Sequence, residues 1–217
     1  MMPRAGLAVV AMLLVAGCVK AVPPDYHAFR AHQPRSILVL PPVNQTTNVV
    51  APYSYLSTMT RPLAECGYYV FPVAVVDAFM RENGLPGAAE MQAAPLEKIR
   101  DVLGADAVLY ITLDEWGQKY IVISSNTVVR AHASLVDVAT GTPLWSGTVN
   151  AVQSSSAGQT NILAMLITAA ITQVVDSMVD SAHDLARVAN HGMVLNGFNG
   201  MLLGPYHPGS QADARGR

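Results

Sequence analysis

Three carboxylates toward the carboxyl end of the chain are spaced so that a helix would carry them on one face. Asp176, Asp180 and Asp184 recur every four residues, and Arg187 follows Asp184 by three. Such a stripe could hold a divalent ion weakly or dock a basic partner. The same spacing is typical of the solvent-exposed face of an amphipathic helix, and we favour this interpretation. No metal site is therefore predicted.

Residues that could form a nucleophilic catalyst are present, but their spacing does not complete one. The serines at 154–156 lack the Gly-x-Ser-x-Gly turn that an esterase nucleophile requires. His132 is expected on the polar, solvent-facing side of a strand, and the histidines form no His-x-x-x-His pair suited to zinc. Neither of the common glycine-rich phosphate-binding motifs occurs. The sequence predicts a non-enzymatic protein with no catalytic residues, metal or cofactor.

The cysteine at position 18 carries the strongest chemical signal. One early charge, Arg4, and an apolar run over 7–15 precede it, as is typical of a secretory signal peptide. The run is too short for a membrane-spanning helix, which needs roughly 20 residues. Ala16 and Gly17 directly before Cys18 resemble the lipobox of bacterial lipoproteins. That resemblance implies diacylglyceryl transfer to the Cys18 thiol, cleavage before it and acylation of the new amino terminus.

Composition limits the classes of partner. After loss of residues 1–17 the chain has 200 residues and a net charge of −3. This composition does not provide the clustered basic surface that nucleic-acid binding requires. Charged residues make up 13%, against roughly 25% in typical soluble domains, so part of the surface is expected to meet a partner or the membrane. Once Cys18 is acylated, Cys66 has no cysteine to pair with and is expected to be buried.

The chain divides into four predicted parts. A signal peptide (1–17) precedes a lipidated, proline-rich tether (18–35), one α/β domain (36–188) and a Gly- and Asn-rich tail (189–217). Within the domain, strands are predicted at 36–40, 68–72, 106–114, 121–138 and 143–149, and helices at 52–66, 73–82, 95–103 and 159–188. The clearest element is the antiparallel hairpin around residues 139–142, where apolar and polar residues alternate on the incoming strand.

Three segments in order resemble known envelope lipoproteins. Ser36-Ile-Leu-Val-Leu-Pro-Pro-Val-Asn44, Gly104-Ala-Asp-Ala-Val-Leu-Tyr-Ile-Thr112 and Leu135-Val-Asp-Val-Ala-Thr-Gly-Thr-Pro-Leu-Trp145 are similar to segments of lipoproteins related to CsgG, the curli-secretion lipoprotein. Over nearly the whole mature chain, including Gly204-Pro-Tyr-His-Pro208, the sequence more closely resembles a family of bacterial lipoproteins of unassigned activity. That family includes a meningococcal surface-antigen candidate.

The resemblance implies a fold, a location and a class of partner. The fold would be α/β, with a mixed sheet, an antiparallel hairpin and packed helices, like the amino-terminal domain of TolB. The protein would be an outer-membrane lipoprotein facing the periplasm that accompanies a CsgG-like transport component, with a homodimer as a further option. Val19, rather than aspartate, after the acylated cysteine also favours the outer membrane. The resemblance supplies no catalytic residues.

The expected function is tethered binding, in which the lipid raises the local concentration of a folded module near its partner. The candidate contacts are Ile162 and Leu166 at the start of the last helix, and Tyr206 and His207 in the tail. Tyr206 and His207 could instead pin the tail to the domain as an aromatic staple. Two other functions stay open: an accessory regulator of peptidoglycan synthesis and, less favoured, an envelope hydrolase.

Overall fold

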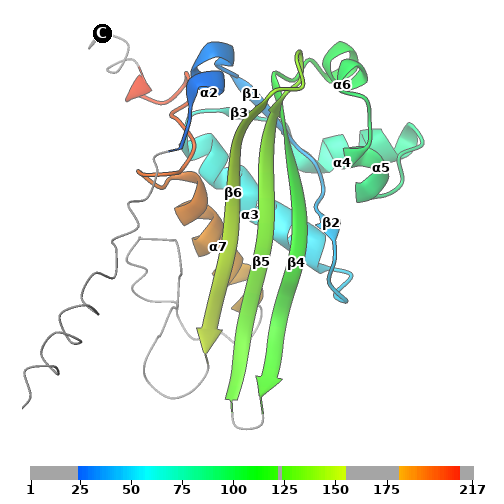
Figure 1. The fold of residues 1–217 in the computed structure, drawn as a ribbon. Helices are drawn as coiled ribbons and strands as arrows, with labels where there is room; N and C mark the ends of the chain where they lie inside the picture. Colours follow the sequence, from blue (N-terminus) through cyan, green and yellow to red (C-terminus); the bar gives the residue numbers. More distant parts are fainter. Residues whose placement is uncertain (1–23, 122–123, 155–180, 211–217) are drawn as a thin grey trace, which may run out of the picture.

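A mixed β-sheet forms the centre of the computed structural model, which describes residues 24–121, 124–154 and 181–210 (Figure 1). The strand order is β3-β1-β4-β5-β6, with the short β2 also pairing with β4. β1 pairs in parallel with β3 and β4, and β2 pairs in parallel with β4. The β4–β5 and β5–β6 pairs are antiparallel, which confirms the predicted mixed α/β fold. The strands are β1 (Ser36–Val39), β2 (Val43–Asn44), β3 (Tyr69–Val70), β4 (Ala107–Ile121), β5 (Ser124–Asp137) and β6 (Pro143–Ser154).

The predicted hairpin between β5 and β6 is confirmed, with Val129 opposite Ala151 and Leu135 opposite Trp145. Ala131 and Ala133 are buried beside them, whereas His132 between them is exposed, as alternation along a half-buried strand requires. Both β4 and β6 run further than predicted, to 121 and 154 instead of 114 and 149. Their extensions are held by pairing with β5, so ladder hydrogen bonds compensate for a weaker apolar pattern.

Helices cover both faces of the parallel part of the sheet because successive residues of β1 point to opposite sides. Ile37 and Val39 join the core that α3 and α7 cover, and Leu38 and Leu40 join the core beneath α4, α5 and α6. In Figure 1, α3 and α7 lie behind the long strands, and α4 to α6 lie beside them. The helices are α2 (His27–His32), α3 (Ala51–Glu65), α4 (Val73–Glu82), α5 (Ala88–Gln92), α6 (Leu96–Leu103) and α7 (Ser181–Val194).

The structure corrects the expected ends of the domain. Residues 27–32 form helix α2 rather than an irregular tether, because Phe29 is 3% exposed and packs in the main core. Helix α7 continues past residue 188 to Val194, which is itself buried. Within the described ranges, no helix combines the length and apolar character that crossing a bilayer requires.

Several predicted features lie outside the described residues. They are the lipidation site Cys18, the helix start with Ile162 and Leu166, the serines 155 and 156, and the carboxylates Asp176 and Asp180. Asp184 is described, and its Oδ1 lies 3.5 Å from Nη2 of Arg187 on the surface of α7. That pair agrees with a solvated helix face. The described residues contain no group of acidic, histidine or cysteine side chains that could hold a metal ion.

Candidate binding groove

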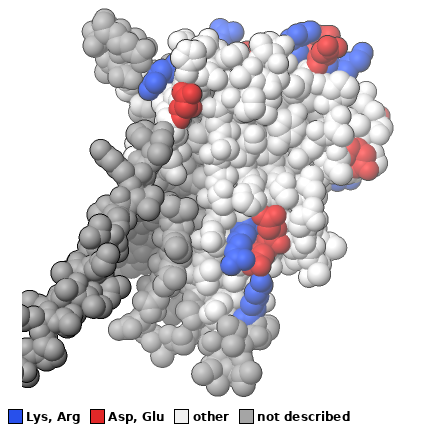
Figure 2. Space-filling view, in the orientation of Figure 1, with Lys and Arg blue, Asp and Glu red and all other residues white. Residues whose placement is uncertain are grey.

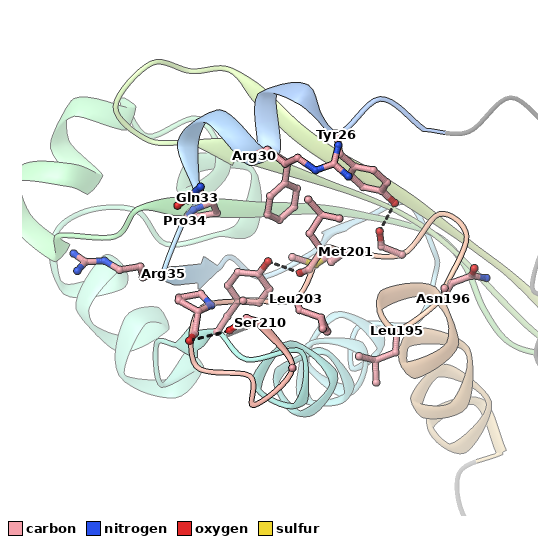
Figure 3. Close-up of a pocket in the computed structure, with 18 of the residues that line it drawn as sticks. Tyr26, Arg30, Gln33, Pro34, Arg35, Leu195, Asn196, Met201, Leu203 and Ser210 are labelled. Carbon is pink, nitrogen blue, oxygen red and sulfur yellow. Dashed lines mark hydrogen bonds between the residues drawn. The ribbon is translucent and has the colours of Figure 1, made fainter. Parts of the chain in front are cut away.

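A groove of about 1250 Å³ opens between α2 and the segment 195–210 that follows α7 (Figure 3). Residues 26–35 form one wall, and the carboxyl-terminal segment forms the other. Tyr68, directly before β3, also lines the groove. The two walls are about 170 residues apart in sequence, as the bond between Tyr26 and Gly200 shows. Folding of the whole domain is therefore needed to build the groove.

Two buried or partly buried tyrosines hold the carboxyl-terminal wall in place. Tyr26 donates its hydroxyl to the Gly200 carbonyl oxygen at 2.5 Å, and Tyr68 donates to the Leu202 carbonyl oxygen at 2.5 Å. Trp145 of β6 adds a third bond, from its indole N–H to the Asn199 carbonyl oxygen at 3.0 Å. Backbone carbonyls of an irregular segment are thus satisfied by side chains of the domain, as buried polar groups require. The wall is fixed rather than loosely draped.

Residues 204–207 make close backbone contacts with the turn after α3. Gly204 N–H donates to the Cys66 carbonyl oxygen at 2.8 Å, and Tyr206 N–H donates to the Gly67 carbonyl oxygen at 3.1 Å. Gly67 has φ +92°, and a Cβ there would overlap the His207 backbone. A Cβ on Gly204 would overlap the Gly67 carbonyl. The two glycines allow the chains to approach, and Gly67 also adopts the left-handed conformation that ends α3, as predicted.

The side chains of Tyr206 and His207 differ in their exposure to solvent. The backbone of 204–207 makes the staple contacts, while the Tyr206 side chain is 65% exposed. His207 is half-buried, and its Nδ1 accepts a hydrogen bond from Gly209 N–H at 2.9 Å. The tail is pinned as expected, but by Tyr26, Tyr68 and Trp145 instead of by the Tyr206 ring. Tyr206 is left free to contact something outside the domain.

Exposed apolar side chains surround the groove. Phe198 is 51% exposed and Leu203 is 47% exposed, both in the carboxyl-terminal wall. On the opposite wall the Arg30 guanidinium lies over the Tyr26 ring, 6.0 Å from its centroid. An amphipathic rim of this composition suits a ligand or surface with both apolar and polar parts.

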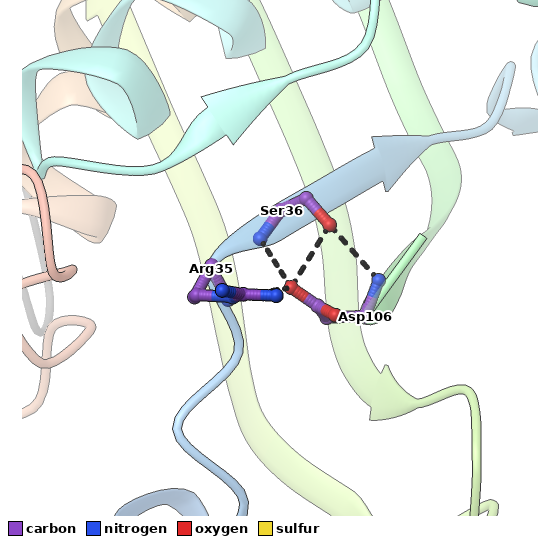
Figure 4. Close-up of polar contacts among 3 residues, drawn as sticks. All are labelled: Arg35, Ser36 and Asp106. Atoms are coloured by element: carbon purple, nitrogen blue, oxygen red, sulfur yellow. Dashed lines mark hydrogen bonds and ion pairs between the residues drawn. The ribbon is translucent and has the colours of Figure 1, made fainter. Parts of the chain in front are cut away.

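The amino-terminal wall is anchored to the sheet by Asp106 (Figure 4). Its Oδ2 accepts hydrogen bonds from Arg35 N–H at 2.9 Å and from Ser36 N–H and Oγ at 3.0 Å. In return, Asp106 N–H donates to Ser36 Oγ at 3.0 Å. The Arg35 guanidinium is 3.9 Å from the same carboxylate oxygen, with 71% of the side chain exposed. The carboxylate thus fixes the start of β1 through the backbone more than through its ion pair.

The Cys66 thiol lies beneath the carboxyl-terminal wall. It is buried, as predicted, and its Sγ is 3.4 Å from the Leu202 carbonyl oxygen. Burial raises the pKa of the thiol to about 11, and the nearby Gly204 backbone offsets only part of this effect. Because the thiolate is the reactive form, Cys66 is a structural residue and not a nucleophile.

One arrangement that the sequence did not reveal joins a hydroxyl, an imidazole and a carboxylate across β4, β5 and β6. His132 Nε2 is 3.2 Å from Asp114 Oδ2, and His132 Nδ1 is 3.2 Å from Thr148 Oγ1. These groups could form a nucleophilic relay, but the His132 side chain is 64% exposed on the open face of the sheet. The groove described above does not include them. The predicted surface position of His132 is confirmed.

Further exposed apolar side chains lie at the start of α3 and along α4. Val49, Val50, Tyr53, Val75 and Phe79 are between 36% and 84% exposed. The Tyr53 hydroxyl donates to Asp77 Oδ1 at 3.1 Å, which ties the first turn of α3 to α4. Charged side chains are sparse on the face that Figure 2 shows, and one group of them lies over the long strands. Some of the exposed charges are paired with each other, as Lys119 and Arg130 are with Glu115. The low charge content thus coincides with two groups of exposed apolar side chains.

Comparisons with known proteins agree with the sequence resemblance. A family model described as "Putative lipoprotein GNA1162-like" matches residues 24–206. A protein of Neisseria meningitidis serogroup B (strain ATCC BAA-335 / MC58), named putative lipoprotein NMB1124/NMB1162, is 38% identical over 201 residues, which cover 92% of this chain and 94% of the relative.

Two solved structures align with the chain to different degrees. The crystal structure of lipoprotein GNA1162 from Neisseria meningitidis aligns with 43% identity and a TM-score of 0.55, over 58% of this chain and 88% of that one. The LpoB carboxyl-terminal domain from Salmonella enterica aligns with 20% identity and a TM-score of 0.38, over 66% of this chain and 92% of that one.

Proposed function

The chain belongs to the GNA1162-like family of putative lipoproteins, and from this membership we propose that it is a non-enzymatic, lipid-anchored protein that binds another component of the cell envelope. In this proposal residues 1–17 are removed and Cys18 receives the lipid. The domain then stands on the outer membrane and faces the periplasm. The lipid confines the domain to the membrane surface and thereby raises its effective concentration near partners on that membrane.

The exposure of apolar side chains at two places on a packed domain carries the binding proposal. One is the groove, where Phe198 and Leu203 line a wall and Tyr206 follows the lining residue Pro205, and the other comprises exposed side chains at the start of α3 and along α4. Contiguous exposed apolar groups are characteristic of interaction sites. His207 supports the groove wall from inside, so of the two predicted tail contacts we propose Tyr206 alone as a contact. Ile162 and Leu166 stay proposed contacts.

The proposed protein partner is a CsgG-like lipoprotein of an envelope transport system. The three sequence segments quoted above support this choice. Regulation of peptidoglycan synthesis stays an alternative function.

Photo-crosslinking in the native envelope tests the proposal. A benzophenone amino acid is placed at Tyr206 or Phe79, and at Val102 as a control, because Val102 of α6 is 59% exposed and belongs to neither surface. We expect one discrete protein adduct from at least one of the two surfaces and none from Val102. Equal labelling at all three positions would contradict a specific partner. Mass spectrometry of the amino-terminal peptide checks acylation of Cys18 separately.

A further inference from the structure

We propose that the groove rim lies against the lipid bilayer that holds the anchor, and that its aromatic and apolar side chains enter the headgroup layer. The inference rests on the proposed acylation of Cys18, and it assigns different roles to the two exposed surfaces. Phe198 and Leu203 of the groove and the adjoining Tyr206 meet lipid, and the exposed apolar side chains at the start of α3 and along α4 remain for a protein partner.

The length of chain between the anchor and the groove supports this position. Five residues, 19–23, separate Cys18 from Pro24, and the groove wall begins two residues later at Tyr26. A fully extended chain spans at most about 3.3–3.6 Å per residue, so Pro24 lies within about 20 Å of the acylated residue. A wall that begins this close to the lipid places the mouth of the groove near the membrane surface.

The side chains at the rim have the chemistry of a membrane interface. Tyr206 follows the lining residue Pro205 and is 65% exposed, and a phenol ring of this kind is favoured at the level of the headgroups. Phe198 and Leu203 line the groove and offer apolar surface to the acyl boundary. Two of these exposed groups line the groove, and the third directly follows a lining residue. Their burial in lipid would remove apolar area from water that the isolated domain leaves exposed.

The charges around the groove are compatible with phospholipid headgroups. Arg30 and Arg35 are both exposed and line the groove, and no carboxylate of the described residues does. Two carboxylates lie nearby. Asp106 Oδ2 is engaged by backbone N–H groups of Arg35 and Ser36, and Asp25 accepts from His27 N–H at 2.8 Å. The Arg35 guanidinium is 3.9 Å from Asp106 Oδ2 and the Arg30 guanidinium lies over the Tyr26 ring, but both side chains are exposed and can also approach headgroup phosphates.

The opposite side of the sheet provides a matched control position. Val75 of α4 is 66% exposed, close to the 65% of Tyr206, and α4 packs on the core that contains Leu38 and Leu40. The groove adjoins the other core, which contains Phe29 and Tyr68. A probe at Val75 therefore has similar access to water in the free domain but lies on the other side of the sheet.

An environment-sensitive dye tests the proposal on the acylated full chain. Tyr206→Cys and Val75→Cys are labelled with a nitrobenzoxadiazole maleimide, since Cys18 is blocked by lipid and the buried Cys66 thiol should not react. The proteins are reconstituted into vesicles of phosphatidylethanolamine and phosphatidylglycerol. We expect a blue shift and quenching by brominated lipids at position 206, and neither at position 75.

The outcomes separate this inference from the proposed function. If mass spectrometry finds Cys18 unmodified, the lipid-anchor proposal fails whatever the dye reports. If Cys18 is acylated but the dye at 206 behaves like the dye at 75, the bilayer contact is overturned. A blue shift at 206 in native envelope membranes but not in protein-free vesicles would also overturn it, because a protein would then cover the rim.

Discussion

Tyr55 and Asn190 join α3 to α7 through a hydrogen bond that is completely buried. The Tyr55 hydroxyl donates to Asn190 Oδ1 at 2.6 Å, and neither side chain is exposed to solvent. Asn190 Nδ2 in turn donates to Thr58 Oγ1 at 2.7 Å, so the amide is satisfied on both sides. Burial raises the pKa of Tyr55, which keeps the phenol a donor. A polar residue thus specifies how the two helices pack.

Removal of the Tyr55 hydroxyl should destabilise the domain. Tyr55→Phe leaves Asn190 Oδ1 buried without its donor, which costs about 1–3 kcal/mol of unfolding free energy. Urea unfolding followed by circular dichroism measures the loss. Tyr53→Phe is the matched control, because that ring is 43% exposed and water can replace its hydroxyl contact with Asp77. Equal losses for the two variants would show that the buried pair has no special role.

The same pair explains why the end of α7 was predicted too early. Asn190 and Gly192 favour the end of a helix in a local reading of the sequence, but Asn190 is bound inside the core and Met193 and Val194 are buried beyond it. Tertiary contacts override local preference here. In contrast, Gly67 and Gly104 end α3 and α6 as predicted, because both have the positive φ that glycine tolerates.

Other differences have similar causes. Helix α2 is six residues long, too short to show a periodic pattern, and it depends on Phe29 reaching the core. The extension of β4 contains Glu115 and Lys119, whose charges break the apolar alternation although the ladder with β5 continues. The groove itself joins two ends of the chain, and no local pattern reports such a contact. The hairpin, the existence of the long strands and the ends of α3 and α6 were predictable, whereas the ends of α7, β4 and β6 and the groove were not.

The Cys66 thiol should be unreactive in the folded protein. Its pKa of about 11 leaves little thiolate at neutral pH, and the carboxyl-terminal wall covers it. Because the folded pKa is raised above its ordinary value of 9.0, this group stabilises the fold most below pH 9, and the contribution is lost between pH 9 and 11. Wild type should therefore lose more stability than Cys66→Ala across that window. Rapid labelling of the native chain by a thiol reagent at pH 7 would contradict the buried position.

Gly67 should tolerate no side chain. Gly67→Ala places a Cβ at φ +92° and against the His207 backbone, so we expect a loss of about 1–3 kcal/mol from strain, with further loss from overlap. Gly197→Ala is the control, since it has open space around its Cα and no positive φ. Thermal unfolding compares the two. A destabilisation by Gly197→Ala as large as that by Gly67→Ala would rule out close packing as the cause.

Tyr68 should control how firmly the groove wall is held. Tyr68→Phe removes the hydrogen bond to the Leu202 carbonyl oxygen, and amide exchange over residues 204–207 should become faster while exchange in the central strands changes little. Tyr69→Phe controls for the loss of a hydroxyl, because Tyr69 is 52% exposed. Hydrogen–deuterium exchange with mass spectrometry resolves the two regions. Uniform acceleration over the whole chain would instead indicate global destabilisation.

Asp106 should stabilise the amino-terminal wall mainly through backbone hydrogen bonds. Asp106→Ala removes the acceptor for Arg35 N–H and for Ser36, and we expect a loss of about 1–3 kcal/mol in unfolding free energy. Arg35→Gln removes only an exposed pair at 3.9 Å and should cost less than about 1 kcal/mol, a cost that salt screens further. Unfolding at low and high ionic strength separates the two contributions. If the two variants lose equal stability at low salt, and both losses shrink at high salt, then the ion pair rather than the backbone contact holds the start of β1.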